Sequence, residues 1–295
     1  NEKGFSEAGY RRPAIGADSL EEAKSFFGWT FFEHEVLEKY LNDSRGSVEE
    51  WSKQGLTIRW VDKMVLRAYR NSEDMIIIII DDLVDIPDEE LPHWYHHNTS
   101  PAGEIPEEMI TNYLKGEWVE SESPAIAVKN AVTELNNAFK ENFGEELYKQ
   151  TGDEIETEKL LTLPRNERQT FLDTMSEVDQ IITENLFKDS LEEQLPSNIV
   201  NEKVEGEKSS LFEFTKTLAG QQTASNILRP VNAVHDFRNE NSHNKVEQGG
   251  WSRGMKALSY PINSENFRDM YRDVMRDVAK SLRKIATLIR SSNSG

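Results

Sequence analysis

The stretch Ile227–Lys245 reads ILRPVNAVHDFRNENSHNK, and it indicates the architecture of the C-terminal half of the chain. Four of its apolar residues recur at helical spacing: Ile227, Leu228, Val231 and Val234. We therefore expect an amphipathic helix, part of a central helix over residues 221–243. Arg238 follows Val234 by four positions, so it continues the apolar face of the helix. A guanidinium there needs an anionic partner or a ligand, because burying an unpaired charge is costly.

Two polar residues lie just beyond Arg238 and complete an R-N-x-x-x-H pattern, namely Asn239 and His243. These two are four positions apart and therefore share one face of a helix. Arginine binds phosphate with two parallel hydrogen bonds, and histidine transfers protons near neutral pH. The pattern predicts a cluster for phosphate binding or proton transfer at the end of the helix.

The R-N-x-x-x-H pattern at the end of an amphipathic helix, inside a helical C-terminal half, resembles the HEPN superfamily. The resemblance covers about residues 123–290. It implies a helical bundle with the activity of a metal-independent endoribonuclease, an enzyme that cleaves RNA and needs neither metal nor cofactor. Many members act in toxin, antiviral-defence and RNA-processing systems.

The resemblance also assigns roles to the three residues of the motif. Arg238 would stabilise the phosphate in the transition state, and His243 would act as the general acid–base. Asn239 would orient the histidine or the substrate. Because two such motifs usually face each other across an interface in this family, the resemblance implies a homodimer.

Four further residues around the motif are candidates for substrate binding: Arg229, His235, Lys245 and Arg253. For the three cations the alternative is a solvated basic patch. For His235 it is a helix residue satisfied by a neighbour. Arg238 itself has the alternative of an ion pair with a carboxylate of the bundle, such as Asp236 or Glu240, in which case His243 would only end the helix.

The composition of the 295-residue chain limits the possible functions. A formal net charge of −19 disfavours a general nucleic-acid-binding protein, which needs a basic surface. It favours the alternative of a non-catalytic HEPN-like module that binds RNA, nucleotide or protein. A second alternative is a scaffold in which the motif is coincidental. A small basic cleft on an acidic protein would still permit ribonuclease activity.

The cysteine content and the lengths of the apolar segments indicate where in the cell the chain is expected. The absence of cysteine excludes disulfides and thiolate catalysis, and it is typical of a cytoplasmic protein. No apolar run approaches the roughly 18 residues of a membrane helix, so we expect a soluble, intracellular chain without a membrane partner. The chain begins at Asn1 rather than Met, and further domains before Asn1 are one expectation.

The pattern of elements predicts an α+β protein of two domains. The first, 1–120, is a small module of short helices and an antiparallel β meander, and the second, 121–295, is an all-α HEPN-like bundle. The strands expected in the meander are Leu56–Trp60, Met64–Ala68 and Met75–Ile80, from alternation and a β-branched run. Helices are expected to begin at Ser19 and Ser47 from capping boxes, over Phe31–Leu41, and from Pro106 to Lys115. The helices are expected to cover one face of the sheet.

In the bundle, apolar stripes and caps predict helices over 123–144, 171–186, 210–219, 221–243 and 264–289. Ser264 is the expected cap of the last helix. A polar linker is expected over 196–209. Gly249, Gly250 and Gly254 predict a loop that carries Arg253 and Lys256.

Two other patterns in the sequence bear on metal or nucleotide chemistry. His93, His96 and His97 follow Asp81 and Asp82, but their spacing matches no familiar zinc site, so a histidine-rich surface loop is expected instead. The run Met75–Ile80 before Asp81 resembles a Walker B strand, yet the G-x-x-x-x-G-K-[ST] motif that an ATPase needs is absent. We therefore predict no metal and no cofactor.

Overall fold

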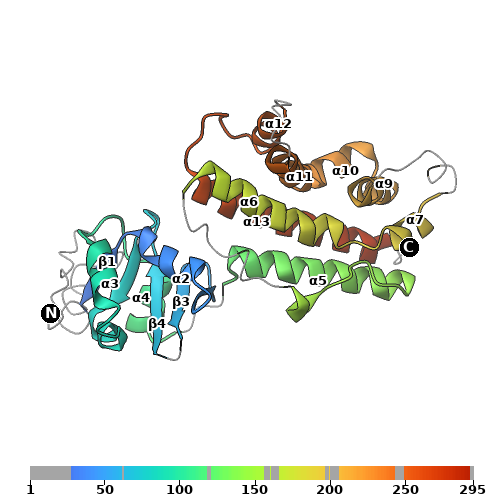
Figure 1. The fold of residues 1–295 in the computed structure, drawn as a ribbon. Helices are drawn as coiled ribbons and strands as arrows, with labels where there is room; N and C mark the ends of the chain where they lie inside the picture. The colour runs from blue at the N-terminus through green and yellow to red at the C-terminus, as the bar shows by residue number, and fades with distance from the viewer. Residues whose placement is uncertain are drawn as a thin grey trace. The chain divides into compact units, whose positions relative to one another are not determined.

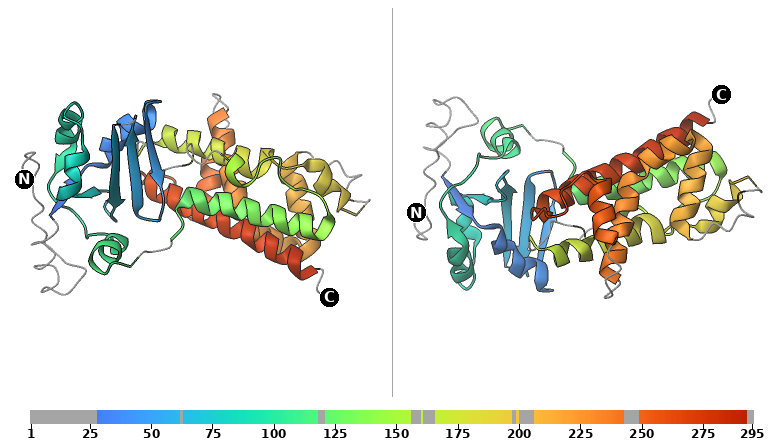
Figure 2. Two further views of the ribbon diagram at one scale, coloured as in Figure 1. Left: turned by 90° about the horizontal axis from the view of Figure 1, so that it is seen from below. Right: turned by 90° about the horizontal axis from the view of Figure 1, so that it is seen from above.

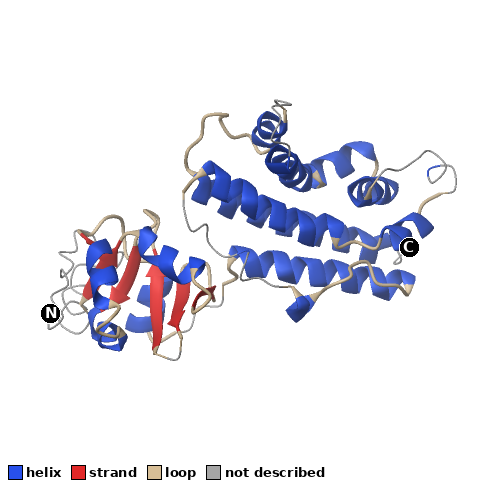
Figure 3. Ribbon diagram, in the orientation of Figure 1, coloured by secondary structure: helices blue, strands red, loops and turns tan. Residues whose placement is uncertain are grey.

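The computed structural model describes residues 28–61, 63–117, 121–155, 160, 166–196, 199, 206–242 and 249–292. The chain divides into two compact units, Asn1–Ser123 and Pro124–Gly295. The first unit ends at Ser123, close to the position 120 expected from the sequence. It combines a sheet with short helices, whereas the regular elements of the second are helical (Figures 1 and 3). The predicted α+β class is confirmed.

The described residues of the first unit form a six-stranded antiparallel sheet with the order β2-β3-β4-β5-β1-β6. The strands are β1 (Trp29–Phe32), β2 (Gly46–Glu50), β3 (Gly55–Trp60), β4 (Met64–Arg70), β5 (Ile76–Ile79) and β6 (Asn98–Thr99). Strands β3, β4 and β5 are the predicted meander. Strand β5 pairs with β4 on one side and β1 on the other. Its four isoleucines alternate between the apolar cores on the two faces of the sheet, and all four are buried.

Helices cover both faces of this sheet, whereas the sequence analysis expected them on one. One face packs against η1 (His34–Leu37), α2 (Glu38–Asn42) and α3 (Leu91–His97), through residues such as Tyr40 and Trp94. The other face packs against α4 (Glu107–Leu114) through Met109 and Ile110. A short 3₁₀ helix, η2 (Ile80–Asp85), follows β5. The central strands carry apolar side chains on both faces, as Phe31 and Phe32 of β1 show, so both faces of the sheet need a covering layer.

Three local predictions for the first unit were wrong. The capping-box pattern at Ser47 belongs to strand β2, because Glu50 is buried and accepts a hydrogen bond from Arg70 Nη1 at 3.0 Å. The expected helix Phe31–Leu41 begins as strand β1, since Phe31 and Phe32 pair with β5. The expected histidine-rich loop is helix α3, because Pro92 lies in its first turn, where proline is tolerated. The helix predicted at Ser19 lies outside the described residues.

The second unit is a helical bundle around one large apolar core. Its helices are α5 (Pro124–Phe143), η3 (Gly152–Glu154), α6 (Arg168–Asp179), the π-helical turn η5 (Gln180–Glu184), α7 (Lys188–Glu193), α9 (Glu207–Ala219), α10 (Gln221–Ile227), α11 (Arg229–Ser242), α12 (Gly250–Ala257) and α13 (Phe267–Ser292). The two long helices α5 and α13 run side by side in both views of Figure 2.

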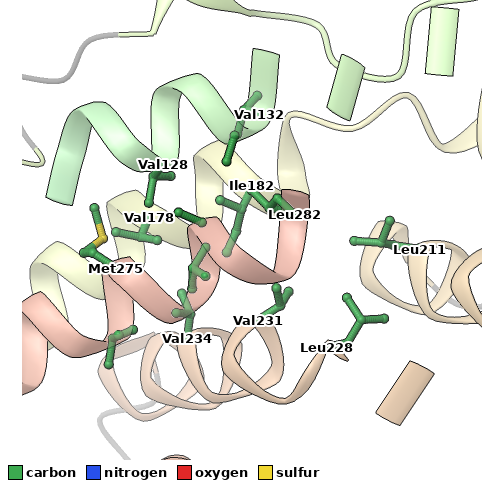
Figure 4. Packing of buried hydrophobic residues seen from close by; sticks show 14 of the residues in the cluster. Val128, Val132, Val178, Ile182, Leu211, Leu228, Val231, Val234, Met275 and Leu282 are labelled. Atoms are coloured by element: carbon green, nitrogen blue, oxygen red, sulfur yellow. The ribbon is translucent and has the colours of Figure 1, made fainter. Parts of the chain in front are cut away.

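Apolar side chains from five parts of the bundle meet in its core. Figure 4 shows Val128 of α5, Val178 of α6, Leu211 of α9, Val234 of α11 and Met275 of α13, which belong to one hydrophobic cluster. All five are fully buried. The predicted apolar stripes therefore pack into one core. They belong to the helices expected around 123–144, 171–186, 210–219 and 264–289. None of the helices in the described ranges has the length and apolarity needed to cross a lipid bilayer.

Three predictions for the bundle needed correction. The central helix over 221–243 is divided at Leu228 into α10 and α11, because Pro230 lacks the N–H that a continuous helix requires. Residues 207–209, expected in a linker, belong to the start of α9, and Gly206 is its N-cap. The last helix begins at Phe267, and Asn266 rather than Ser264 accepts the N–H of Asp269.

The glycines that predicted a loop lie at the start of and within helix α12 instead. A Cβ at Gly250 would lie 2.5 Å from the backbone oxygen of Asp236, and one at Gly254 would lie 2.5 Å from the ring of Phe237. Both contacts are with α11. The glycines therefore allow two helices to approach closely, and their effect is on packing rather than on chain flexibility.

We expect Gly250→Ala to destabilise the bundle by about 1–3 kcal/mol, because overpacking against a backbone atom exceeds the gain in helix propensity. The measurement is urea unfolding followed by circular dichroism. Gly249→Ala is the matched control, since a Cβ at Gly249 would meet only the flexible end of Arg253. Equal stability of the two variants would contradict the close approach of α11 and α12.

Candidate functional site

Arg238 lies on α11 opposite the point where α6 continues into the π-helical turn η5. Its Nη1 donates a hydrogen bond to Asp179 Oδ2 at 2.8 Å, and its Nη2 forms an ion pair with Glu184. The side chain of Arg238 is 27% exposed, that of Asp179 is 0% exposed and that of Glu184 is 45% exposed. The guanidinium is thus held by one buried carboxylate and one at the surface.

The π-helical turn explains how both carboxylates reach the same guanidinium. Asp179 and Glu184 are five positions apart, and in an α-helix such residues point in different directions. A π turn closes hydrogen bonds between residues five apart, as the Asn185 N–H does with the Gln180 carbonyl at 3.0 Å. Residues separated by five therefore face the same way, and Asp179 and Glu184 both face Arg238.

Asp179 is the centre of the polar cluster. Its Oδ1 accepts the hydroxyl of Thr183 at 2.9 Å, and its Oδ2 lies 3.2 Å from Nδ1 of His235 as well as beside Arg238. Burial of the carboxyl group would raise its pKa, but the hydrogen bonds from His235 and Arg238 outweigh burial, so the pKa of Asp179 is lowered. Asp179 is therefore ionised at neutral pH, and its bond to Arg238 raises the pKa of the guanidinium.

Arg238 does form ion pairs with carboxylates, but its partners are not the expected Asp236 and Glu240. Glu240 accepts a hydrogen bond from Arg168 at 2.9 Å, and Asp236 accepts one from Arg253 at 3.1 Å. Both are occupied by other arginines of the bundle. The partners of Arg238 come from α6 and η5, which are more than fifty residues earlier in the chain.

The structure brings together only some of the predicted site residues. His235 joins Arg238 at Asp179, while Asn239 is half-buried and makes no side-chain hydrogen bond with the other described residues. Arg229 is exposed at the start of α11, nine positions from Arg238 and therefore on the opposite side of the helix. His243 and Lys245 lie outside the described residues.

Arg253 and Lys208 bring positive charge to the same region. Arg253 is an exposed residue of α12, paired with Asp236. Lys208 of α9 is half-buried, and burial lowers the pKa of its ammonium although Asp236 and Asp179 oppose that change. The described cationic or protonatable side chains of the region therefore include Arg238, His235, Lys208 and Arg253.

Sequence reasoning missed Asp179, Glu184 and Lys208. A signal for Asp179 was present, since it follows Met175 by four positions and so lies on the apolar face of α6. An acidic residue there requires a cationic partner. Glu184 gave no such signal, because its place depends on the π turn.

Two other features of the described residues, a histidine cluster and a pocket, lack the chemistry of a metal or phosphate site. No three histidine or carboxylate side chains among them are arranged to hold a metal ion, and this includes His93, His96 and His97 of α3. A pocket of about 610 Å³ lies beside Glu184, and Glu154 and Glu177 also line it, with Lys149. Because carboxylates predominate there, the pocket does not suit a phosphate.

Comparison with known proteins adds no assignment for this site. No protein-family model matches the sequence, and neither the curated proteins nor the solved structures contain a match.

Asp179 contributes to the stability of the folded protein, and we expect that contribution to decrease at acid pH. The unfolded aspartate has a pKa of about 3.9, and the folded value is lower. Protons therefore bind preferentially to the unfolded chain below about pH 4, and the contribution is complete above about pH 5 and is lost as the pH falls through the folded pKa. Asp179→Asn should cost roughly 3 kcal/mol at pH 7 and less as the pH falls.

The measurement is the free energy of unfolding of both proteins between pH 3 and pH 7. Asp173→Asn is the matched control, because Asp173 is an exposed carboxylate on the same helix. A difference between wild type and Asp179→Asn that does not change with pH would contradict an ionised Asp179.

Proposed function

We propose that this chain is a metal-independent endoribonuclease of the HEPN type, with Arg238 as the phosphate-binding residue and His243 as a general acid–base. The observation that supports the proposal most is the unequal contact of Arg238 with two carboxylates. Asp179 holds the guanidinium from a fully buried position, whereas Glu184 is 45% exposed and can move away. A phosphate oxygen can then take the place of Glu184 without disturbing the buried contact.

The reaction that fits these groups is transfer of the phosphodiester to the neighbouring 2′-oxygen. A base removes the 2′-hydroxyl proton, the 2′-oxygen bonds to phosphorus, and the bond to the 5′-oxygen breaks as that oxygen receives a proton. Arg238 would stabilise the additional negative charge on the phosphorane. Histidine suits both proton transfers near neutral pH.

The charge of the chain makes the local cations important. With a net charge of −19, the protein repels RNA at long range, but salt screens that repulsion beyond about 10 Å at 0.1 M. Binding then depends on Arg238, Lys208 and Arg253, which lie in one region. We propose that RNA reaches Arg238 along the face of α11 that carries His235, and that a phosphate oxygen then displaces the exposed carboxylate of Glu184.

The resemblance extends the proposal to assembly and setting. Two motifs facing each other would require a homodimer of this chain. Light scattering measures the mass of the particle and so tests for the dimer. A cytoplasmic toxin or antiviral effector is the setting typical of such ribonucleases.

A second candidate is favoured by the same ion pair. Two of the three guanidinium nitrogens of Arg238 already contact carboxylates, so the group can be part of the bundle alone. The protein would then be a non-catalytic module that binds RNA, nucleotide or another protein. The two candidates differ in what a change at Arg238 does to activity and to stability.

We expect the purified protein to cleave RNA in EDTA and to leave 2′,3′-cyclic phosphate ends. Arg238→Gln should lower the cleavage rate by about 10²–10³-fold, the effect of removing one transition-state donor. It should also lower stability by about 1–3 kcal/mol, because Asp179 loses one of its donors. The measurements are end analysis of the fragments and thermal unfolding, with the assay run well below the melting temperature.

Arg276→Gln is the control, since Arg276 is an exposed arginine of α13 paired with Asp273. It should change neither quantity. If the wild-type protein cleaves no RNA while Arg238→Gln is destabilised, the ribonuclease proposal fails and the second candidate is supported.

Removal of the exposed carboxylate should increase activity. We expect Glu184→Gln to raise the affinity for inorganic phosphate, and kcat/KM for RNA, about five- to tenfold, since a charge that competes for Arg238 is lost. Phosphate affinity is measured by calorimetry. Glu177→Gln is the matched control because Glu177 lines the same pocket. Equal values for the two variants would show that Glu184 does not compete with phosphate.

A further inference from the structure

We propose that His235 is a proton-transfer residue of this ribonuclease and that Asp179 is its positioning carboxylate. The inference rests on the proposed function and adds a catalytic residue to it. The R-N-x-x-x-H pattern assigns proton transfer to His243 alone. The structure instead places a second imidazole at the anion that orients Arg238.

The geometry gives His235 one engaged nitrogen and one available nitrogen. Nδ1 lies 3.2 Å from Asp179 Oδ2, the same oxygen that accepts the hydrogen bond of Arg238 at 2.8 Å. The side chain of His235 is 26% exposed, and no hydrogen bond within the described part of the chain uses its Nε2. His235 and Arg238 are three positions apart and share one face of α11. A phosphate held by Arg238 would therefore have Nε2 of His235 beside it.

The buried carboxylate determines which nitrogen carries the proton. Asp179 is ionised at neutral pH and accepts hydrogen bonds only, so the neutral imidazole must present Nδ1–H to it. Nε2 then has a free lone pair, which is the form that a general base needs. An aspartate fixes the tautomer and the orientation of a catalytic histidine in the same way in serine proteases.

The charges around His235 come from four elements. Asp179 of α6 and Glu184 of η5 favour the protonated imidazolium, as does Asp236 of α11. Arg238 of α11 and Lys208 of α9 oppose it. Of these groups, Asp179 is the one in direct contact with the imidazole, at 3.2 Å from Nδ1.

The chemical step assigns the base role to His235. Its Nε2 takes the proton of the 2′-hydroxyl, and the 2′-oxygen forms a bond to phosphorus. The bond from phosphorus to the 5′-oxygen breaks, and that oxygen receives a proton from a second acid. The products are a 2′,3′-cyclic phosphate and a 5′-hydroxyl, and no oxidant or other reactant is needed.

His235→Asn is the informative variant, because the asparagine amide keeps a donor near the position of Nδ1 while the base is removed. We expect normal folding and a fall in kcat for RNA cleavage of about 10²–10⁴-fold, the usual effect of a general base. The acidic limb of the pH profile of kcat/KM should also disappear. Asp179→Asn should reduce kcat and shift that limb while KM changes little. His96→Asn, an exposed histidine of α3, is the control and should behave as wild type.

The outcomes separate this inference from the ribonuclease proposal. If wild type cleaves RNA and His235→Asn cleaves equally well with an unchanged pH profile, the inference is wrong and the ribonuclease remains. If wild type cleaves nothing, the ribonuclease proposal fails, and the imidazole is followed by ¹⁵N NMR as inorganic phosphate is added. A shift of the His235 Nε2 signal in wild type, absent in Arg238→Gln, would support an anion site shared by the two residues. The absence of a shift in wild type would overturn that shared site.

Discussion

The burial of one negative charge, the carboxylate of Asp179, constrains the second unit of this protein. That carboxylate has no exposed surface, and an isolated buried charge would cost several kcal/mol. Thr183, His235 and Arg238 together supply its hydrogen bonds. Two of these donors belong to α11, so α6 and α11 satisfy the charge only in one relative position.

The rest of the contact between α6 and α11 follows the same antiparallel register. Arg168 pairs with Glu240 near the start of α6, and Asn241 donates to both Asp173 and Ser176 further along. These groups are mostly exposed, and each such pair contributes little to stability. The apolar core supplies the driving force for packing, and the polar contacts between α6 and α11 select which alignment of the two helices is adopted.

The sequence predicted what depends on local pattern and missed what depends on tertiary contact. Alternation and a β-branched run identify β3, β4 and β5, because a half-buried or buried strand leaves that pattern. The capping box at Ser47 was misleading, since Glu50 is used in a buried ion pair with Arg70 instead of at a helix end. Gly250 and Gly254 predicted a loop for a similar reason, because close contact between two helices and chain flexibility both require glycine.

The candidate site shows the same division. Arg238 was found because its place on an apolar face can be read from spacing alone. Its partner Glu184 could not be found in this way, since Glu184 reaches Arg238 only through the π turn. Lys208 could not be placed in the same region either, because it comes from another helix. His235 was noted for its spacing, but its connection to Arg238 passes through Asp179 and not along the helix.

A phosphate-binding arginine in an acidic protein must meet two opposing requirements. It has to be held in place without substrate, which favours carboxylate partners, and it has to release a partner when substrate arrives. A single carboxylate cannot meet both, because leaving Asp179 would expose an uncompensated buried charge. Two carboxylates of unequal burial can meet them, since Asp179 keeps the guanidinium oriented while the exposed Glu184 exchanges with solvent at small cost. The π-helical turn that brings both carboxylates onto one face is therefore the structural feature on which the proposed phosphate binding by Arg238 depends.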